Sequence, residues 1–371
     1  MARDAAAGAV YFGGGGTGGH LYPAIAVAEA LGRVRPGLGV HFVGALRGVE
    51  ARVLPASNWP HDLLPLQGLD RRRPWRNGGA ITGLLTGIRR LDALDREKPV
   101  RAAVGTGGYA AGALLAWAVL RRRPIFLWEG NATAGLTVRL FSRFATRVFL
   151  GFPEARASLP AAGRARVVVS GNPITPPPRN RAARAVARAA WGFGAEVRRV
   201  VLVFGGSQGA RALNRAIADW LPGALPPEWG AIWITGPAEH AEYAALASPR
   251  VRVVAYQSPM ADAYATADLA IARAGAMSTS ELCAWGIPMI LVPLPTSAGD
   301  HQRVNARALD AAGAARLVEQ ATLGPATLDR AVAPLFTDTA ALATMGQRAS
   351  SRACPDAADV IARAILDALP T

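Results

Sequence analysis

The chain carries the same local pattern twice, once in each half: a short apolar run, a glycine-rich turn and a helix-forming stretch. In the first half, residues 10–12 lead into the glycines of residues 13–19, and a helix is expected at about residues 23–33. In the second half, residues 200–204 lead into the glycines of residues 205–209 and another helix. A strand that passes through a tight turn into a helix is typical of parallel sheets, where the helix returns the chain to begin the next strand. The pattern therefore predicts one parallel sheet in each half.

Further apolar runs support the two sheets. They alternate with helical stretches, and they lack the polar–apolar alternation of a strand with one face in water. The expected strands cover residues 40–43, 102–104, 125–128, 147–150 and 167–170 in the first half and residues 231–235, 251–254, 269–272 and 289–292 in the second. We therefore predict the α/β class, with two doubly wound Rossmann-like domains.

The boundary between the domains is expected near residue 164, because a glycine-containing stretch and three prolines at residues 176–178 follow it. This gives a first domain of residues 1–164 and a second domain of residues 165–351. The last segment, residues 352–371, carries apolar residues at helical spacing. Its apolar face must pack on one of the domains, and the pattern alone does not say which.

Composition bounds the compartment and the partners. At 371 residues, 51% of them hydrophobic, the chain is long enough for two packed domains. The two cysteines, Cys283 and Cys354, argue against a disulfide framework or a cysteine metal site and suggest a reducing compartment. The net charge of +15 comes almost wholly from arginine, since Lys98 is the only lysine, and it favours anionic partners. The longest apolar run, residues 110–120, is too short to cross a bilayer.

The first glycine turn fits an anion site. Gly14, Gly16 and Gly19 have the spacing of the dinucleotide fingerprint, in which backbone N–H groups approach a phosphate at a helix N-terminus. A nicotinamide dinucleotide is disfavoured, because the next strand ends in Gly44 and not in the acidic residue that binds a ribose. A P-loop is excluded, because no Gly-Lys-Ser/Thr occurs in the chain.

Two more features of the first half are candidates for a site. His20 follows the glycine turn directly, and an imidazole, which titrates at about pH 6.5, suits a general base for a hydroxyl nucleophile. The alternative is that His20 only hydrogen-bonds the loop backbone. A second glycine turn, residues 105–109, suggests an anion cradle that would hold a diphosphate together with residues 16–19. The alternative there is the steric requirement of a tight turn.

In the second half, polar side chains stand in apolar sequence, where they are costly unless bonded or used. Glu281 can accept hydrogen bonds from both hydroxyls of a ribose, and Gln302 and Asn305, three apart on a helix, can bind a sugar. The alternative is helix capping. Ser278 and Glu281 have the spacing of a capping box, and Asp300 suits an N-cap.

Metal dependence is not expected. No Asp-x-Asp occurs in the chain, so a metal-bridged diphosphate is disfavoured. Helix N-termini at Ser207 and Ala276, with Arg211 or Arg273, are the alternative source of positive charge for a diphosphate.

Residues 69–90 form a basic stretch with an apolar stripe. After Trp75, its apolar residues fall at helical spacing and arginines flank them: Ile81, Leu84, Leu85, Ile88 and Arg89. Such a segment can rest on an anionic membrane surface, with the tryptophan at headgroup depth. The alternative is a stripe that faces the core while the arginines stay in solvent.

Short motifs recur along the chain in a fixed order. They are residues 14–20, 105–109, 131–137, 171–173, 205–211 and 273–276, completed by Glu281, Asp300, Gln302 and Asn305. In this order and spacing they resemble the MurG family of bacterial UDP-GlcNAc transferases, over nearly the whole chain.

The resemblance implies a GT-B fold, with an acceptor-binding first domain, a donor-binding second domain and a cleft between them. The last helix, within residues 352–371, would return to the first domain. The implied reaction is an inverting, metal-independent transfer of GlcNAc from UDP-GlcNAc to the 4-hydroxyl of the MurNAc of lipid I, the undecaprenyl-linked muramyl-pentapeptide. The product would be lipid II for peptidoglycan synthesis. No cofactor and no nucleic acid is implied, and the expected location is an anionic membrane surface, peripherally on the cytoplasmic face of the cell membrane.

The resemblance also implies residue roles. His20 is the candidate base, Glu281 would hold the uridine ribose, and Gln302, Asn305 and Asn131 would hold the GlcNAc hydroxyls. The donor-binding residues are Thr17, Gly18, Gly19, Asn131, Ser207, Gln208, Gln257, Arg273, Ala276, Met277, Ser278, Thr279, Ser280, Glu281, Gln302 and Asn305. The acceptor-binding residues are Gly16, Gly107, Gly108, Tyr109 and Glu129.

Three stretches depart from the family's pattern. Trp128 and Gly130, around Glu129, stand in place of the usual histidine and glutamine, which affects the acceptor side. Thr175 replaces an arginine and removes one diphosphate contact. The segment that begins at Gln257 replaces apolar-Asp-Asp-Met, although a main-chain contact from Gln257 to uracil can survive this change.

Two alternatives of other kinds stay open. One is another GT-B nucleotide-sugar enzyme, such as a related glycosyltransferase or a UDP-GlcNAc epimerase. The other is an arginine-rich polyanion-binding protein, which would leave the turn at residues 275–281 without a role.

Overall fold

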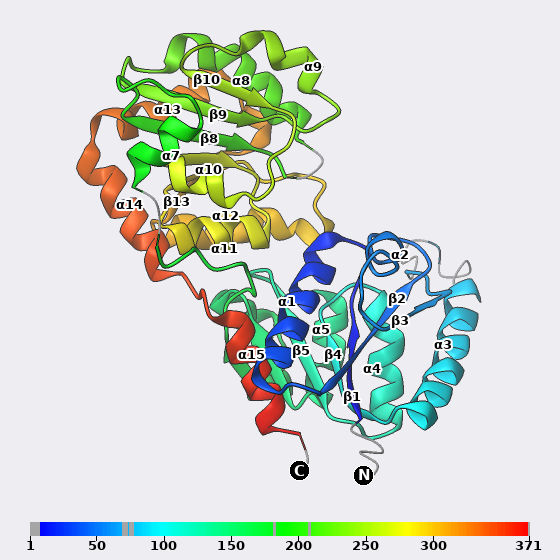
Figure 1. The fold of residues 1–371 in the computed structure, drawn as a ribbon. Coiled ribbons are helices and arrows are strands. Elements are labelled where there is room, and N and C mark those ends of the chain that lie inside the picture. Colours follow the sequence, from blue (N-terminus) through cyan, green and yellow to red (C-terminus); the bar gives the residue numbers. More distant parts are fainter. Residues whose placement is uncertain (1–7, 69–72, 74–77, 181–182, 207–208, 370–371) are drawn as a thin grey trace. The chain divides into compact units, whose positions relative to one another are not determined.

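The computed structural model describes residues 8–68, 73, 78–180, 183–206 and 209–369 (Figure 1). The chain forms two compact units, Met1–Ile174 with Asp356–Thr371, and Thr175–Pro355. Each unit is built on one parallel sheet, so the predicted α/β class is confirmed.

The first sheet has the strand order β3-β2-β1-β4-β5-β6-β7. In that order its strands are β3 (His61–Leu64), β2 (Gly39–Ala45), β1 (Ala9–Gly13), β4 (Val100–Gly105), β5 (Ile125–Glu129), β6 (Arg147–Leu150) and β7 (Val167–Val169). Its helices are α1 (Gly18–Val34), α2 (Glu50–Val53), α3 (Gly78–Glu97), α4 (Ala110–Leu120), α5 (Leu136–Phe141), α6 (Ala161–Arg164) and α15 (Ala357–Asp367), with short 3₁₀ turns at Ser142–Phe144 and Pro153–Ser158.

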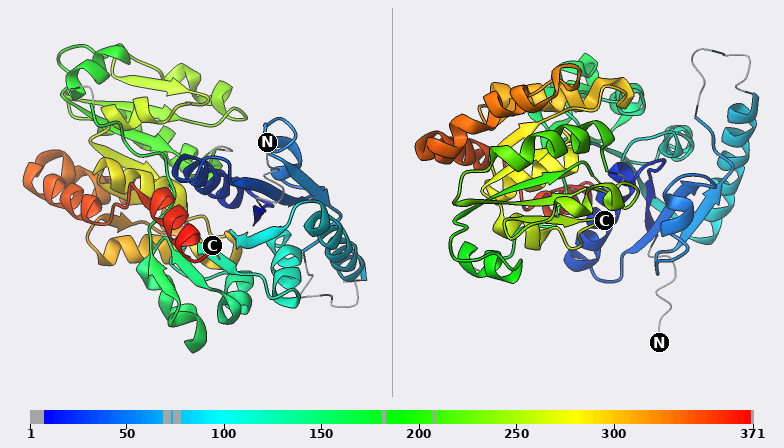
Figure 2. Two further views of the ribbon diagram at one scale, coloured as in Figure 1. Left: turned by 60° about the horizontal axis from the view of Figure 1, so that its bottom comes forward. Right: turned by 90° about the horizontal axis from the view of Figure 1, so that it is seen from above.

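Helices cover both faces of this sheet. Right-handed crossovers place α3, α4 and α5 on one face, because the connections from β3 onward run in the direction opposite to the one from β1 to β2. On that face Tyr11 packs in one cluster with Leu91 of α3 and Leu114 of α4. α15, the last helix of the chain, packs alongside α1 (Figure 1 and Figure 2).

The second sheet has the strand order β10-β9-β8-β11-β12-β13. In that order its strands are β10 (Val251–Val254), β9 (Trp229–Ile234), β8 (Arg199–Phe204), β11 (Leu269–Ala272), β12 (Met289–Leu291) and β13 (Ala315–Leu317). Its helices are α7 (Arg184–Ala190), α8 (Arg211–Ala224), α9 (His240–Tyr243), α10 (Ala261–Thr266), α11 (Ala276–Trp285), α12 (His301–Ala311), α13 (Pro325–Thr337) and α14 (Thr339–Ser351), with 3₁₀ turns at Ala244–Leu246, Ala298–Asp300 and Gln320–Thr322. One cluster joins Val201 and Trp229 of the sheet to Trp220 of α8 and Phe336 of α13.

The structure differs from the expected elements in three places. The first unit extends to Ile174, past the boundary expected near residue 164, because β7 pairs with β6 at the edge of the first sheet. α1 begins at Gly18 and not near Pro23, so His20 lies in its first turn. The edge strands β3 and β13 were not expected.

Candidate active site

In both sheets the strand order reverses between two central strands, and open α/β sheets bind ligands at such a reversal, just beyond the carboxyl ends of the strands. In the first sheet the reversal lies between β1 and β4, whose last residues, Gly13 and Gly105, are register partners. In the second sheet it lies between β8 and β11, where Phe204 is the partner of Ala272. Each reversal therefore brings two of the turns singled out in the sequence next to each other.

In the second unit, the helix that follows β11 presents its N-terminus at the reversal. α11 begins at Ala276 with Gly275 as N-cap, and its first residues, Ala276, Met277 and Ser278, are partly exposed. Backbone N–H groups in the first turn of a helix have no partner within the helix, and with the helix dipole they favour an anion. The neighbouring turn after β8 has Gly206 at φ 94°. Ser207 and Gln208, predicted to bind the donor in this turn, lie outside the described residues.

Glu281 lies in the second turn of α11, and its carboxylate is held from one side. The hydroxyl of Tyr264, on α10, donates to Oε2 of Glu281 at 2.7 Å. Burial raises the pKa of Glu281, and the hydrogen bond from Tyr264 opposes this rise. Ser278 is the third residue of the helix and not its N-cap, so the capping box does not form. Capping therefore does not explain Glu281.

On α12, the two predicted sugar-binding residues have different settings. Gln302 is partly exposed, and its Oε1 accepts a hydrogen bond from Leu294 N at 2.9 Å. Asn305 is fully buried, and its Nδ2 donates to Ala274 O at 3.1 Å. Asn305 therefore holds the turn between β11 and α11, and its contact with a sugar hydroxyl stays a prediction. Asp300 precedes α12 without capping it and pairs with Arg303.

Two more predicted donor residues have internal roles. The guanidinium of Arg273 is buried and donates to Val292 O at 3.0 Å and to Gln320 Oε1 at 2.6 Å, so it ties strand ends together and is not directed at a diphosphate. Thr279 is fully buried, and its hydroxyl donates to Gly275 O at 2.9 Å. Contacts of Arg273 and Thr279 with the donor stay predictions.

Two further candidate residues of the second unit, Arg211 and Gln257, bond to other residues of that unit. Arg211, the alternative cation for a diphosphate, pairs with Glu239 at 2.9 Å. Gln257 donates to Pro259 O at 3.0 Å, within its own loop. The main-chain contact from Gln257 to uracil stays a prediction.

In the first unit, His20 lies next to the glycine turns, where the strand order reverses between β1 and β4. Its Nδ1 lies 3.1 Å from Gly15 O and 3.3 Å from Thr17 Oγ1. A carbonyl only accepts, so the bond to Gly15 puts the ring proton on Nδ1 and leaves Nε2 as the basic nitrogen. The two predictions for His20, a general base and a hydrogen-bond partner of the loop backbone, are therefore compatible. The bond to the backbone orients the ring so that Nε2 can act as the base.

The glycines of the first unit provide close packing. A Cβ at Gly107 would lie 2.9 Å from Cδ2 of His20, and a Cβ at Gly108 would lie 2.4 Å from Gly15 O. The N–H of Gly16 donates at 2.7 Å to the carboxylate of Glu50, which is fully buried. The predicted diphosphate cradle formed by residues 16–19 and 105–109 stays a prediction.

The loop after β5 is organised by its own carboxylate. Glu129 is buried and accepts from Asn131 Nδ2 at 3.0 Å and from Gly135 N at 2.7 Å. Glu129 therefore fixes Asn131 and the start of α5. Tyr109, predicted to bind the acceptor, places its hydroxyl 3.4 Å from Arg47 O. Direct contacts of Glu129, Asn131 and Tyr109 with a substrate stay predictions.

The apolar stripe of α3 divides between core and solvent. Leu84 and Ile88 are partly buried and pack against the core of the first unit. Ile81 and Leu85 have relative exposures of 57% and 53%, and Arg89 is exposed beside them. Trp75 lies outside the described residues. Among the helices that the structure describes, none has the length and apolar run needed to span a membrane.

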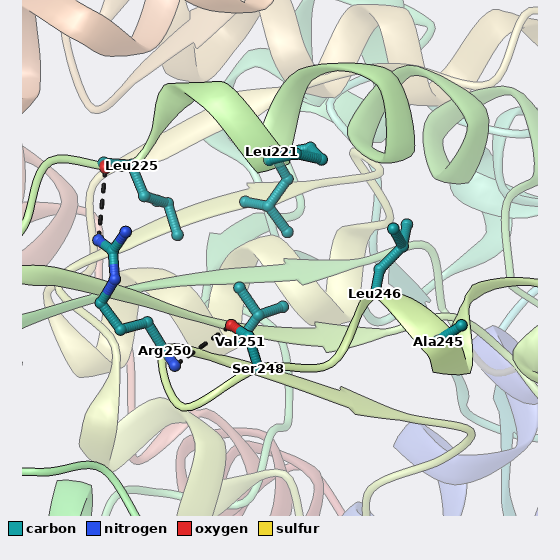
Figure 3. A pocket seen from close by; sticks show the side chains of 8 residues that line it. Leu221, Leu225, Ala245, Leu246, Ser248, Arg250 and Val251 are labelled. Carbon is teal, nitrogen blue, oxygen red and sulfur yellow. Dashed lines mark hydrogen bonds between the residues drawn. The ribbon is translucent and has the colours of Figure 1, made fainter.

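A cavity of about 320 Å³ lies elsewhere in the second unit (Figure 3). It is lined by Leu221, Leu225 and Val251, and Arg250 reaches from its wall to the main chain of Leu225. Val251 is the first residue of β10, so the cavity is at the amino ends of the strands, opposite the edge that carries Glu281. It is therefore separate from the candidate site.

Known proteins resemble this chain over almost its full length. Two family models match it: the glycosyltransferase family 28 N-terminal domain over residues 10–150 and the family 28 C-terminal domain over residues 200–361. A relative from Salinibacter ruber, named UDP-N-acetylglucosamine--N-acetylmuramyl-(pentapeptide) pyrophosphoryl-undecaprenol N-acetylglucosamine transferase, is 42% identical and covers 95% of each chain. A relative of the same name from Chlorobium luteolum is 38% identical, covering 96% of this chain and 98% of its own. Acinetobacter baumannii MurG matches with a TM-score of 0.78 at 30% identity, covering 97% of this chain and 99% of that one.

The chain belongs to the MurG family. The predicted GT-B fold and the glycosyltransferase class are confirmed with it. A UDP-GlcNAc 2-epimerase from Neisseria meningitidis also matches, with a TM-score of 0.64 over 96% of this chain and 99% of that one. At 14% identity that likeness concerns the fold alone.

The structure explains two of the departures from the MurG-family pattern as one change. Trp128 is buried, and a Cβ at Gly130 would lie 2.5 Å from its Cη2 atom. Glycine at position 130 therefore makes the space that the indole at position 128 occupies. Asn172 holds the same segment through a 3.0 Å bond from Nδ2 to Gly130 O. Thr175 is exposed, and nothing in the structure explains its replacement of arginine.

Two residues that support the MurG-family site were not predicted. Tyr264 binds Glu281, and Glu50 binds the first glycine turn. Glu50 stands two residues after Gly48, and Tyr264 stands in the short helix Ala261–Thr266, so neither carries a local motif. A fully buried glutamate is the only sign of Glu50's role, and it appears only in the fold.

Proposed function

We propose that this chain transfers GlcNAc from UDP-GlcNAc to the 4-hydroxyl of the MurNAc of lipid I, with inversion at the anomeric carbon, to give lipid II. The relatives from Salinibacter ruber and Chlorobium luteolum carry the name of this transferase. The observation that carries the proposal is Glu281, a carboxylate bound by Tyr264 at one oxygen, five residues after the start of a helix whose N-terminus suits a diphosphate.

The second unit would bind the donor. Glu281 accepts hydrogen bonds from the vicinal hydroxyls of the uridine ribose, and the first turn of α11 faces the diphosphate. As the glycosidic bond breaks, its electron pair goes to the diphosphate of UDP. N–H groups already aimed at that position stabilise the developing charge without rearranging. This supports a metal-independent transfer, with no cofactor, and Gln302 is the side chain on α12 that we assign to the sugar.

The first unit would activate the acceptor. Nε2 of His20 takes the proton of the muramyl 4-hydroxyl as its oxygen bonds to the anomeric carbon. The backbone bond at Nδ1 keeps the ring in the tautomer that this step needs.

Two substitutions test the donor and base assignments separately. Glu281→Ala should raise the KM for UDP-GlcNAc by roughly 10- to 100-fold with little change in kcat, because hydrogen bonds to a charged group contribute about 1.5–3 kcal/mol. His20→Ala should lower kcat roughly 10²- to 10⁴-fold with little change in that KM. Glu228→Ala, an exposed glutamate before β9, is the control and should leave both constants unchanged.

The assay is transfer of labelled GlcNAc to lipid I in detergent, with and without EDTA. Unchanged UDP-GlcNAc affinity in Glu281→Ala would remove the donor site, and full kcat in His20→Ala would remove the base. Loss of activity in EDTA would contradict metal independence. UDP-GlcNAc alone tests the epimerase alternative, because an epimerase would convert it to UDP-ManNAc without any acceptor.

We also propose that α3 touches an anionic membrane, peripherally on the cytoplasmic face where the nucleotide donor is made available. Ile81 and Leu85 are exposed on one side of α3, and Arg89 is exposed one turn further on. Apolar side chains beside arginine suit a surface of acidic headgroups. Ile81→Ser with Leu85→Ser should reduce co-sedimentation with vesicles containing phosphatidylglycerol and leave UDP binding unchanged. Equal binding of the variant and the original chain would contradict the contact.

A further inference from the structure

A buried carboxylate stands next to the glycine turn of the first unit. Glu50, the first residue of α2, has a relative exposure of 0%. Glycines make room for it, because a Cβ at Gly15 would lie 2.2 Å from its Oε1 and a Cβ at Gly48 would lie 2.7 Å from its Oε2. Fully buried glutamates are rare unless they are hydrogen-bonded and used, because burying a charge is costly.

The hydrogen bonds of Glu50 go to backbone N–H groups. Oε2 accepts from Gly16 N at 2.7 Å, and Oε1 lies 3.4 Å from Ala45 N. The N–H of Gly16 belongs to the same peptide group as the carbonyl of Gly15. That carbonyl lies 3.1 Å from Nδ1 of His20. One peptide group therefore joins the carboxylate at its nitrogen end to the imidazole at its oxygen end.

Hydrogen bonds in such a chain strengthen one another. A negative charge that accepts from the N–H end of a peptide group pushes electron density toward its carbonyl oxygen, which then accepts more strongly. A stronger acceptor at Gly15 holds the ring proton of His20 on Nδ1 and keeps Nε2 in its basic form. The hydroxyl of Thr106 donates to the carbonyl of His20 at 2.8 Å and fixes the backbone that carries the ring.

We propose that Glu50 is a positioning residue for His20, acting through the Gly15–Gly16 peptide group. The proposal rests on the proposed role of His20 as the base, and it assigns to a carboxylate and a peptide group together the orienting task that a carboxylate alone performs in a serine hydrolase triad. Glu50 itself touches no substrate.

Other charged and titratable groups around the turn are few among the described residues. Tyr109 lies against Gly16: a Cβ built on Gly16 would lie 3.4 Å from Cε1 of Tyr109. Burial raises the pKa of Tyr109, the charge of Glu50 adds to the rise, and Arg47 opposes it. The charge of Glu50 therefore reaches the side chains that surround the turn, and Arg47 is the cation that counters it there.

The first test is a double-mutant cycle between Glu50→Gln and His20→Ala, with kcat as the readout. Glutamine keeps the size of the side chain and one oxygen that accepts from Gly16, but it removes the charge. Alone, Glu50→Gln should lower kcat roughly tenfold without changing the KM for UDP-GlcNAc. In the His20→Ala background it should change kcat by less than about twofold, because the residue through which it acts is gone. Glu29→Gln makes the same chemical change on the exposed side of α1 and is the control, expected to leave kcat unchanged.

The second readout is the pH profile of kcat. If the charge of Glu50 acts on the ring through the peptide group, the pH of half-maximal kcat should be lower in Glu50→Gln than in the unsubstituted chain, because a negative charge near a base favours its protonated form. A role of Glu50 in stability alone would lower the amount of active protein without moving this midpoint. An unmoved midpoint, or an equal fall in kcat in both backgrounds of the cycle, overturns the proposal.

A third measurement needs no variant of Glu50 and no activity. Nitrogen-15 spectra of the histidine rings report which ring nitrogen carries the proton. The signal of His20 is the one that disappears in His20→Ala. We expect Nδ1 in the unsubstituted chain, and Nε2–H in that chain overturns the proposal even if Glu50→Gln fails to fold. If His20→Ala keeps full kcat, the base assignment fails, while the proton position still shows whether Glu50 and the peptide group orient the ring.

Discussion

At the scale of single residues, Glu281 stands in a setting that opposes its own charge. Burial raises its pKa above the ordinary glutamate value, and the bond from Tyr264 opposes this only as the lesser effect. Between the unfolded and the folded pKa the folded protein binds more protons, so the contribution of Glu281 to stability falls as the pH rises through that window and is unfavourable above it. The residue assigned to donor binding therefore weakens the unit that carries it.

This leads to a prediction on Glu281→Gln. At neutral pH the variant should have the same or a higher melting temperature, because the amide keeps the bond from Tyr264 without the buried charge. Its affinity for UDP should fall. Melting curves from pH 4 to pH 8 should show any gain in stability shrinking toward the acid end, where Glu281 is protonated in both folded and unfolded chains. A melting temperature clearly below that of the original chain at neutral pH would contradict the claim that the charge of Glu281 lowers stability.

The pair of Trp128 and Gly130 gives a second prediction. Gly130→Ala should destabilise the first unit by about 1–3 kcal/mol, because the new methyl group overlaps the indole ring. In a chain with Trp128→His, the smaller ring leaves space and the same change should cost much less. The measurement is the free energy of unfolding in urea for all four chains. Equal costs in both backgrounds would show that the two positions are independent.

The sequence indicated which turns carry the site but not which side chains face a ligand. Glu281 and His20 follow from their places after a strand and a glycine turn. Thr279 and Asn305 have equally suitable chemistry, but their polar groups bond carbonyls of the same turn, at Gly275 and Ala274. Hydroxyl and amide groups can bond either a ligand or the protein's own main chain. The sequence therefore does not show that these two side chains bond carbonyls of the turn.

At the scale of elements, most strands were predictable from their apolar runs, and two of the four edge strands, β3 and β13, were not. β6, β10 and β11 have the bounds that their apolar runs indicate. β3 begins with His61 and Asp62, and β13 has only three residues. A strand at the edge of a sheet buries less surface and pairs on one side, so its sequence carries less apolar signal.

α3 depends on glycine for its packing, which gives a prediction at this scale. A Cβ at Gly83 would lie 2.3 Å from Pro65 O, a backbone atom that cannot move alone. Gly83→Ala should therefore destabilise the first unit by about 1–3 kcal/mol despite the better helix propensity of alanine. Gly32→Ala on α1 is the matched control, because nothing lies within 4 Å of its Cβ position. The control should gain about 0.5–1 kcal/mol, and a gain at Gly83 of the same size would refute the close contact.

At the scale of the whole molecule, two units with separate cores predict separate responses to a ligand. UDP at about a hundred times its Kd should stabilise the second unit by about 2.7 kcal/mol, which raises its unfolding temperature by roughly 5–10 °C. The transition of the first unit should stay in place. Differential scanning calorimetry measures both, and Glu281→Ala should abolish the shift. If UDP raised the unfolding temperature of the first unit alone, the assignment of the nucleotide to the second unit would be wrong.

The return of α15 to α1 has a consequence for synthesis. α15 buries Ile361, Ala362 and Ile365 in the unit that contains β1. Every strand of the second unit leaves the ribosome before this helix is made. Domains usually fold in the order in which they emerge. Here the unit that emerges first must wait, with part of α1 uncovered, and the inserted unit is the first to be completed.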